Sequence, residues 1–309
     1  MERIVLFGGS GFIGKHAVKQ LMGKYEIVIV SRHKRTTSEE FGEEVNVLRL
    51  RRSDISKITE QINGAAAVIN LAGENVGERW TSSKMDKIKK SRLDVDSIIV
   101  RAVTNAEIKP KVVIQGSAIG IYGNSRNTID INEETTLGQR GFLTKVAISH
   151  EEALNQLEKV TRVVYIRTGM VLGGDGGALP KLSAQFKLYL GGKLGSGNQW
   201  SSWIHIDDEV RAIKFLIEND SCSGAYNLTA PNPVTNKEFT KKLANTLKRP
   251  HFMSAPAFVL RLFLGTMANE LLITGLKVIP TRLIDAGFKF KYSKIEDAFE
   301  NIFRENIVE

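Results

Sequence analysis

Short apolar runs recur through the first half of the chain, and several are followed by stretches whose apolar residues return at helical spacing. The runs have the length and the β-branched content of buried strands. The predicted strands cover residues 3–7, 26–30, 45–50, 65–71, 111–115 and 162–167. The predicted helices between them cover residues 15–21, 56–62, 81–106 and 143–157. Strands that alternate with helices predict an α/β fold built on a doubly wound parallel sheet.

Beyond residue 169 this alternation fades. Further helices are predicted over residues 179–190, 207–218 and 236–247, with glycine-rich loops between them. We therefore expect residues 1–169 to form a nucleotide-binding domain and residues 170–309 to form a smaller, mainly helical C-terminal cap that binds the substrate. No clean linker separates the two, so the cap is expected to interleave with the core. It should lie above the strand ends, where open α/β sheets bind ligands.

The first predicted strand runs directly into a glycine-rich turn. Gly8, Gly11 and Gly14 are spaced G-x-x-G-x-x-G, and a helix of apolar periodicity follows at once. Such glycines permit a tight turn and let the backbone approach a pyrophosphate, which the N-terminus of the helix attracts. Because strand, turn and helix occur in this order, they predict a Rossmann-type dinucleotide site rather than a chance glycine cluster.

The end of the second predicted strand indicates which dinucleotide binds. An NAD site usually has an acidic residue here that accepts hydrogen bonds from the ribose hydroxyls. This chain has Ser31 and Arg32 instead, followed by a basic stretch over residues 33–35. A guanidinium can hold a phosphate group through two donors. The pattern favours NADP(H); the alternative is a solvated basic loop.

Bulk properties limit the other partners. The net charge is +9, but no aromatic residues interleave with the basic clusters, so no nucleic-acid partner is expected. The basic residues between positions 84 and 92 recur with apolar ones at helical spacing, which predicts a mostly solvated helix face. Charges interrupt the longest apolar stretch, residues 256–278, so no membrane partner is expected. One cysteine and an immediate first strand predict a cytoplasmic protein, and the histidines predict no metal site.

Further motifs follow the glycine turn in a recognisable order. Asn70-Leu71-Ala72-Gly73, Gly116-Ser117 and residues 202–208 occur in the order seen in extended short-chain dehydrogenases/reductases. The segments that narrow the resemblance are residues 70–75, 79–81, 167–173, 190–197 and 199–205. Together they resemble the atypical "epimerase family protein" subgroup, often labelled nucleoside-diphosphate-sugar epimerase. The resemblance covers nearly the whole chain, and in that subgroup the C-terminal segment, here residues 259–305, is a domain of unknown function.

The resemblance implies a set of residues around NADP(H). These are Gly8, Gly11, Phe12, Ile13, Gly14, Ser31, Arg32, Asp54, Leu71, Ala72, Gly73, Glu74, Arg79 and Arg167. Asp54 is implied beside the adenine but equally suits a cap of the helix that follows it. Glu74 and Arg79 line the site in this reading; alternatively they form a surface ion pair. Arg167, at the end of a buried strand, requires an anionic partner.

The catalytic positions depart from the resembled family. Its ordinary members use a serine and a Tyr-x-x-x-Lys pair on the helix after the fifth strand, and the tyrosine exchanges a proton with the substrate. Here that helix is entered by residues 141–146, which include no tyrosine. Ser117 ends the fifth strand, where the family's serine polarises a carbonyl, and Tyr122 follows it. His205 is a second candidate base. The sequence favours a packing role in a turn for Tyr122, and for His205 it favours a role in orienting its loop and capping the helix that follows.

Two functions fit these observations. The first is an NADP(H)-dependent enzyme of the extended short-chain type that epimerises, dehydrates or reduces a polar small-molecule substrate, for which a nucleotide sugar is a candidate. The second is a non-catalytic NADP(H)-binding protein that reports the state of the cofactor to a partner. The missing Tyr–Lys pair favours the second, whereas the elaborate second half of the chain favours a ligand and hence the first.

Overall fold

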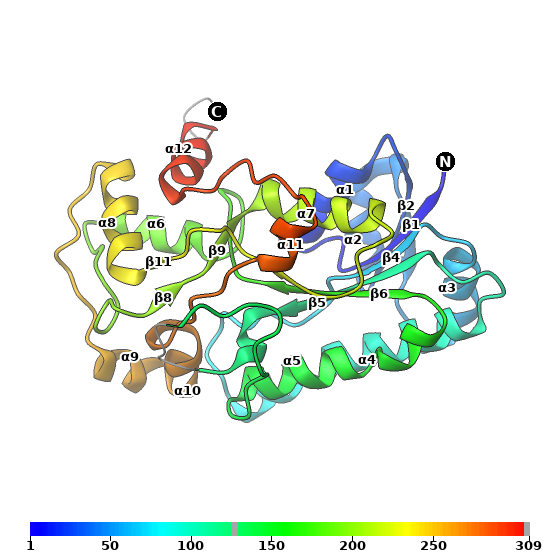
Figure 1. Cartoon of the computed structure of the whole chain (residues 1–309), viewed down its shortest axis with the longest axis horizontal. Helices are drawn as coiled ribbons and strands as arrows, with labels where there is room; N and C mark the ends of the chain where they lie inside the picture. Colours follow the sequence, from blue (N-terminus) through cyan, green and yellow to red (C-terminus); the bar gives the residue numbers. More distant parts are fainter. Residues whose placement is uncertain (125–128, 306–309) are drawn as a thin grey trace.

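A computed structural model of the protein describes residues 1–124 and 129–305, and its centre is a seven-stranded parallel sheet (Figure 1). The strands lie in the order β10-β6-β5-β4-β1-β2-β3, so the order reverses direction beside β1. Their bounds are β1 Arg3–Phe7, β2 Glu26–Ser31, β3 Asn46–Arg49, β4 Ala67–Asn70, β5 Val112–Ala118, β6 Arg162–Thr168 and β10 Gly224–Leu228. This confirms the predicted doubly wound, Rossmann-type sheet.

Helices cover both faces of the sheet. Helices α1 (Phe12–Leu21) and α7 (Ile206–Glu218) pack together on one face, and α3 (Ile55–Ile62), α4 (Ser82–Asn105) and α5 (Phe142–Glu152) pack on the other. Successive side chains of a strand point to opposite faces. Ile4 and Leu6 therefore enter the apolar core under α1 and α7, whereas Val5 and Phe7 enter the core under α3 and α4.

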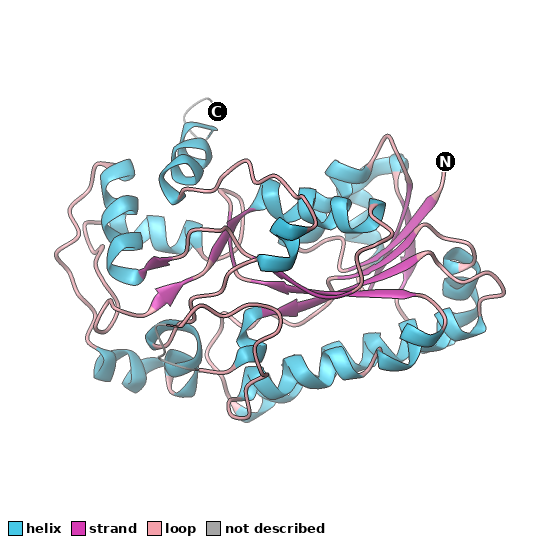
Figure 2. Cartoon of the chain, in the orientation of Figure 1, coloured by secondary structure: helices cyan, strands magenta, loops and turns pink. Residues whose placement is uncertain are grey.

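Apart from α7 and β10, which belong to the sheet and its helical layer, the second half of the chain forms a mainly helical cap beside the carboxyl ends of the strands, as Figure 2 shows. A third apolar core lies within this cap and includes Trp203, Phe239 and Phe299. The helices around this core are α6 (Leu179–Lys187), α8 (Asn236–Leu247) and α12 (Ile295–Glu305). The short strands of the cap are β7 Met170–Leu172, paired with β9 Trp203–His205, and β8 Trp200–Ser201, paired with β11 Val234–Thr235.

The other helices are short. They are α2 Lys34–Phe41, α9 Ala257–Leu264, α10 Thr266–Ala268, α11 Thr281–Asp285, the 3₁₀ turns η1 Gly42–Glu44, η2 Arg52–Asp54, η3 Ile119–Tyr122 and η4 Asn155–Lys159, and the π turn η5 Asn269–Ile273. Across the two described ranges, no helix has the combined length and apolarity that crossing a bilayer would require.

Several boundaries differ from the sequence prediction. Strand β10 and helix α2 were not predicted: β10 is a short edge strand, and Thr37 is the only buried residue of α2, so neither shows a clear apolar period. The predicted helix 143–157 ends at Glu152 and continues as a 3₁₀ turn. The predicted helix 179–190 ends at Lys187, because Tyr189 has a left-handed φ of 62°. Within residues 206–228, helix α7 packs on a face of the central sheet and strand β10 forms one of its edges.

Candidate functional site

The glycines of the turn between β1 and α1 let the backbone pack closely against itself and against the loop after β4. Gly8 has φ +84°, and a Cβ atom on it would lie 2.6 Å from the carbonyl carbon of Leu71. A Cβ atom on Gly14 would lie 2.2 Å from the carbonyl oxygen of Gly8. The first-turn N–H groups of α1, including those of Phe12 and Ile13, have no acceptor within the helix, and no side chain caps them at Gly11. Such a helix N-terminus attracts phosphate.

At the end of β2, one side chain is hydrogen-bonded within the protein and the next is exposed to solvent. Ser31 is buried, shares a hydrogen bond of 2.9 Å with Thr37 and accepts the N–H of His33. Arg32 is exposed and forms no hydrogen bond or ion pair with the residues that the structure describes, although its charge helps to lower the pKa of the Glu74 carboxyl group. An exposed guanidinium beside the second strand end is free to hold a phosphate group.

A cavity of about 100 Å³ lies beside this strand end. Its lining is Lys34, Leu48, Arg49, Asp54, Lys57 and Ile58. Asp54 stands at the N-cap position of α3, but its side chain accepts no capping hydrogen bond. Asp54 therefore makes no capping hydrogen bond through its side chain, and the residue lines this cavity.

Side chains of α4 contact the loop that follows β4 and hold it in place. Glu74 pairs with Lys84 at 2.7 Å, not with Arg79, and this hydrogen bond lowers the pKa of the Glu74 carboxyl group. Arg79 is exposed. The guanidinium of Arg92 lies against Gly73, where a Cβ atom would come within 2.9 Å of it. The prediction of a solvated basic face on this helix is thus wrong for Lys84 and Arg92, because both side chains turn toward the β4 loop.

Ser117, Tyr122 and Arg167 meet in one network. Arg167 donates from Nε and Nη2 to the two carboxylate oxygens of Glu151 on α5, at 3.0 and 2.8 Å. Ser117 donates to Oε1 of Glu151 at 2.6 Å. Nη1 of Arg167 donates to the hydroxyl of Tyr122 at 3.0 Å, and that hydroxyl donates to Oδ1 of Asn227 at 2.7 Å. Glu151 is therefore the anion that buried Arg167 requires.

This network constrains what each side chain can do. Burial raises the pKa of Tyr122, and its proton is already directed at Asn227. Ser117 is only half-buried, so its oxygen can still accept a hydrogen bond from a ligand while its proton faces Glu151. Sequence reasoning missed Glu151, although the anion required by Arg167 was a signal for an acid on the neighbouring helix.

A second buried network, also missed from sequence, supports the β4 turn from below. Asp96 on α4 and His150 on α5 are joined at 2.6 Å, and both contact Gln115 on β5. Asn70 at the end of β4 donates to Asp96 and accepts the N–H of Ala72 at 3.1 Å. These contacts fix the backbone of the Leu71–Gly73 turn, since buried polar groups that are fully paired rigidify their surroundings.

His205 stands apart from the Ser117 network. Its Nδ1 accepts the N–H of Asp207 at the start of α7, and its ring stacks on Tyr292 with 3.9 Å between centroids. The side chain is buried, and this burial lowers the pKa of the imidazole. The capping role considered for His205 is therefore confirmed.

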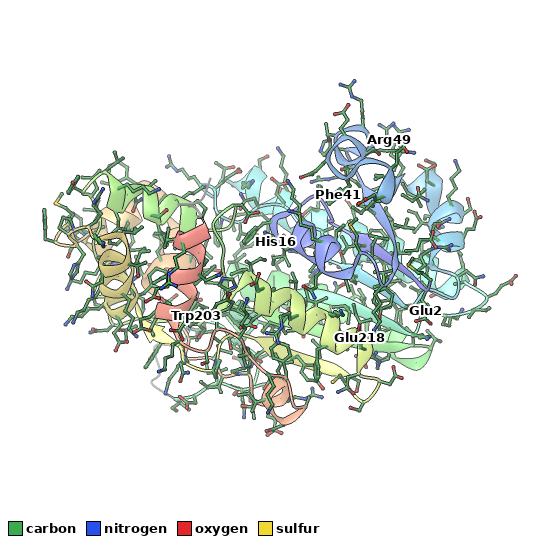
Figure 3. All side chains as sticks on the ribbon, turned by 90° about the horizontal axis from the view of Figure 1, so that it is seen from above. Glu2, His16, Phe41, Arg49, Trp203 and Glu218 are labelled. Atoms are coloured by element: carbon green, nitrogen blue, oxygen red, sulfur yellow. The ribbon has the colours of Figure 1, made fainter. Side chains whose placement is uncertain are left out.

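The cap touches the glycine turn through a glycine-rich loop. Cβ atoms on Gly173 and Gly176 would clash with the ring of Phe12, at 2.6 and 2.3 Å. Asp175 in the same loop pairs with His16 on α1 at 2.9 Å, and Figure 3 labels His16 on the side of α1 toward the cap. The cap thus closes over the start of α1.

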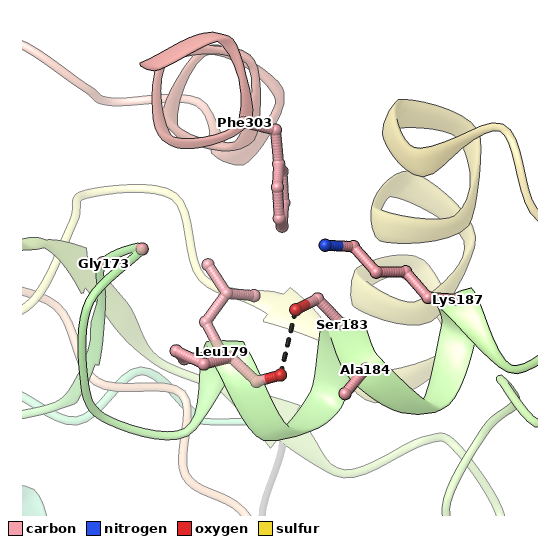
Figure 4. Close-up of a pocket in the computed structure, with 8 residues that line it drawn as sticks. Gly173, Leu179, Ser183, Ala184, Lys187 and Phe303 are labelled. Atoms are coloured by element: carbon pink, nitrogen blue, oxygen red, sulfur yellow. Dashed lines mark hydrogen bonds between the residues drawn. The ribbon is translucent and has the colours of Figure 1, made fainter. Parts of the chain in front are cut away.

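A cavity of about 340 Å³ opens beside this loop, between α6 and α12 (Figure 4). Its lining is Gly173, Gly174, Leu179, Pro180, Ser183, Ala184, Lys187 and Phe303. The Phe303 ring and the Lys187 ammonium point toward the same space in Figure 4. In residues 1–124 and 129–305, no group of three or more His, Cys, Asp or Glu side chains is arranged to hold a metal ion.

The sequence profile of the NAD dependent epimerase/dehydratase family matches residues 4–229. The chain belongs to this family. A second profile, described as a domain of unknown function, matches residues 255–302, close to the predicted segment 259–305. The epimerase family protein YfhF of Bacillus subtilis is 35% identical over 301 residues, which are 97% of each chain. The family predicted from the motifs is thus confirmed.

Two solved structures are similar over almost the whole chain. Human epimerase family protein SDR39U1 (isoform 2), solved with NADPH, has a TM-score of 0.87 and 29% identity, covering 98% of this chain and 99% of its own. The nucleoside-diphosphate sugar epimerase of Corynebacterium glutamicum has a TM-score of 0.77 and 27% identity, covering 98% of this chain and 58% of its own.

Proposed function

We propose that the protein binds NADP(H) across the carboxyl edge of the sheet. The observation that carries this proposal is that α1 begins after the Gly8–Gly14 turn without a side-chain cap, while the next strand ends in the exposed guanidinium of Arg32. Pyrophosphate lies on the turn, and Ser31 and Arg32 face the 2′-phosphate. The cavity around Asp54 takes the adenine, and the β4 loop residues Leu71, Ala72 and Gly73 follow the ribose. The NADPH in the human relative supports this assignment.

In this proposal residues 1–169 supply the cofactor site, and residues 170–309, apart from α7 and β10 that join the sheet, supply the substrate cap. The substrate is polar and nucleotide-linked, and the reaction is an epimerisation, dehydration or reduction in which the nicotinamide supplies or takes up a hydride. The cavity beside Phe303 and Lys187 suits a flat ring and a phosphate group. The name of the Corynebacterium glutamicum protein supports the same substrate class.

Within the chain, Ser117 is the residue that contacts the substrate, because its oxygen can still accept a hydrogen bond. Tyr122 and Arg167 position Ser117 through Glu151, with Glu74 and Arg79 along the mouth of the site. His205 holds α7. Proton transfer by a positioned side chain contributes about 10²–10⁴-fold to a rate, so the lack of a free tyrosine here favours slow turnover.

Calorimetric titration with NADPH and NADH tests the cofactor proposal. Arg32→Glu is expected to weaken NADPH binding about tenfold or more and leave NADH nearly unchanged, because a charge-assisted phosphate contact contributes about 1.5–3 kcal/mol. Arg35→Glu is the matched control, since Arg35 is also exposed but pairs with Glu39. Equal affinities of the parent protein for the two cofactors would refute the proposal.

The second candidate function is a non-catalytic NADP(H) sensor. It is favoured by the start of α5, where the Glu270 carboxylate binds the N–H groups of Phe142 and Leu143 and no tyrosine is present. NADPH oxidation against carbonyl compounds and nucleotide sugars distinguishes the two, using the parent, Ser117→Ala, Tyr122→Phe and His205→Gln. Turnover that falls in Ser117→Ala supports the enzyme. Tight NADPH binding without turnover of any substrate supports the sensor.

A further inference from the structure

A buried acid lies one hydrogen bond from the edge of the site. Glu209 is in the first turn of α7 and is fully buried, at 0% exposure. Its Oε1 accepts a hydrogen bond of 2.8 Å from the hydroxyl of Thr168, the last residue of β6. Its Oε2 is buried and has no hydrogen-bond partner within the described part of the chain. An ionised carboxylate in such a place is costly, so the group is held neutral.

No nearby charge compensates Glu209. Burial raises the pKa of its carboxyl group to about 8, and the hydrogen bond from Thr168 only partly offsets this; no charged group contributes. On α1, Lys15 pairs with Glu40 and His16 pairs with Asp175. On β6, Arg167 pairs with Glu151 on the other face of the sheet. The other titratable groups on α1, β6 and β9 are Lys19, Arg162, Tyr165 and His205, and those on the segment that contacts α7 are Lys289, Lys291 and Tyr292. Those on α7 itself are Asp207, Asp208, Arg211, Lys214 and Glu218.

The position of Thr168 decides which part of a dinucleotide this acid faces. Thr168 is paired in register with Ala118, the exposed last residue of β5, and it is itself half-buried. The adenosine side of the site, at Ser31 and Arg32, lies on the far side of β1. A dinucleotide that crosses the edge at the Gly8 turn therefore brings its nicotinamide end to β5 and β6.

We propose that Glu209 is the acid that compensates the positive charge of the oxidised nicotinamide ring. When NADP+ binds, the O–H bond of Glu209 breaks, the electron pair stays on the carboxylate, and the proton is released to the buffer. NADPH has an uncharged ring, so it leaves Glu209 protonated. This coupling links the redox state of the cofactor to a charge at the N-terminus of α7, so it is compatible with both an enzyme and a sensor. This inference rests on the proposed cofactor binding.

The test compares the affinities for NADP+ and NADPH by calorimetry from about pH 6 to about pH 9. The ratio of the two affinities cancels the titration of the 2′-phosphate and the contact with Arg32, which the two cofactors share. In the parent protein this ratio is expected to shift toward NADP+ by about tenfold across the range, since one unit of pKa change corresponds to a tenfold change in affinity. NADP+ binding near neutral pH should also release a proton, measured in buffers of different ionisation enthalpy.

Glu209→Gln keeps the hydrogen bond from Thr168 but cannot ionise, so its affinity ratio should be independent of pH and its proton release should vanish. Glu218→Gln, at the other end of α7, should behave as the parent. Tight binding of both cofactors with a pH-independent ratio in the parent would overturn this inference alone, as would a ratio that still shifts in Glu209→Gln. Binding of neither cofactor would overturn the proposed function as well. The proton-release measurement needs only the parent protein, so the test stands even if the variant fails to fold.

Discussion

Replacing Glu209 by glutamine should make the protein more resistant to unfolding as the pH rises. In the folded protein, burial raises the pKa of this carboxyl group from its ordinary 4.5 to about 8. Between these two values the folded state binds a proton that the unfolded state releases. The free energy of unfolding therefore falls as the pH rises through this window. Glutamine has no such proton, so this loss disappears in the variant.

The magnitude follows from the width of the window. Each unit of pKa difference is worth about 1.4 kcal/mol, so the parent should lose about 3.5 kcal/mol relative to Glu209→Gln between about pH 5 and about pH 8. Glutamine also introduces an amide N–H group beside the position of the unpartnered Oε2, which costs about 1–3 kcal/mol. That cost is independent of pH and drops out of the slope.

Urea unfolding of the two proteins at several pH values measures this difference directly. The difference in unfolding free energy should widen steadily in favour of the variant as the pH rises. Glu134→Gln, at an exposed position, is the control and should run parallel to the parent. Curves for the parent and Glu209→Gln that stay parallel from about pH 5 to about pH 8 would refute the reasoning, because they would mean that Glu209 is not held neutral.

Three further substitutions test the contacts around the site by urea unfolding. Arg167→Met leaves the carboxylate of Glu151 buried without its cation and should cost about 3–5 kcal/mol; a loss below about 1 kcal/mol would contradict the buried pair. Gly14→Ala brings a Cβ atom into the backbone of Gly8 and should cost about 1–3 kcal/mol and weaken NADPH binding; unchanged stability and affinity would show that the turn can widen. Tyr122→Phe leaves Asn227 without its donor and should cost about 1–3 kcal/mol, whereas a neutral result would mean that water replaces the hydroxyl.

The sequence alone determined the glycine turn and the strand ends beside it. The β1 strand, the glycine turn and α1 are contiguous, so local periodicity and glycine spacing were enough to predict them. Ser117 and Arg167 are 50 residues apart, but they end neighbouring parallel strands in register. Because the carboxyl ends of parallel strands share one edge, the fold class already implied that they would meet. The edge strand β10 and the polar helix α2 were not predicted, because neither shows a clear apolar periodicity.

Only the tertiary structure decided how the side chains pair beneath that edge. Arg167 forms hydrogen bonds with Glu151, which is 16 residues away in the sequence. Asp96 pairs with His150 over 54 residues, and Thr168 pairs with Glu209 over 41 residues. Each pairing depends on which face a helix turns toward the sheet, and a shift by one residue rotates a helical side chain by about 100°. Burial then decides the protonation state of Glu209. The sequence alone would suggest a charged surface glutamate, but its burial beneath β6 favours the protonated form.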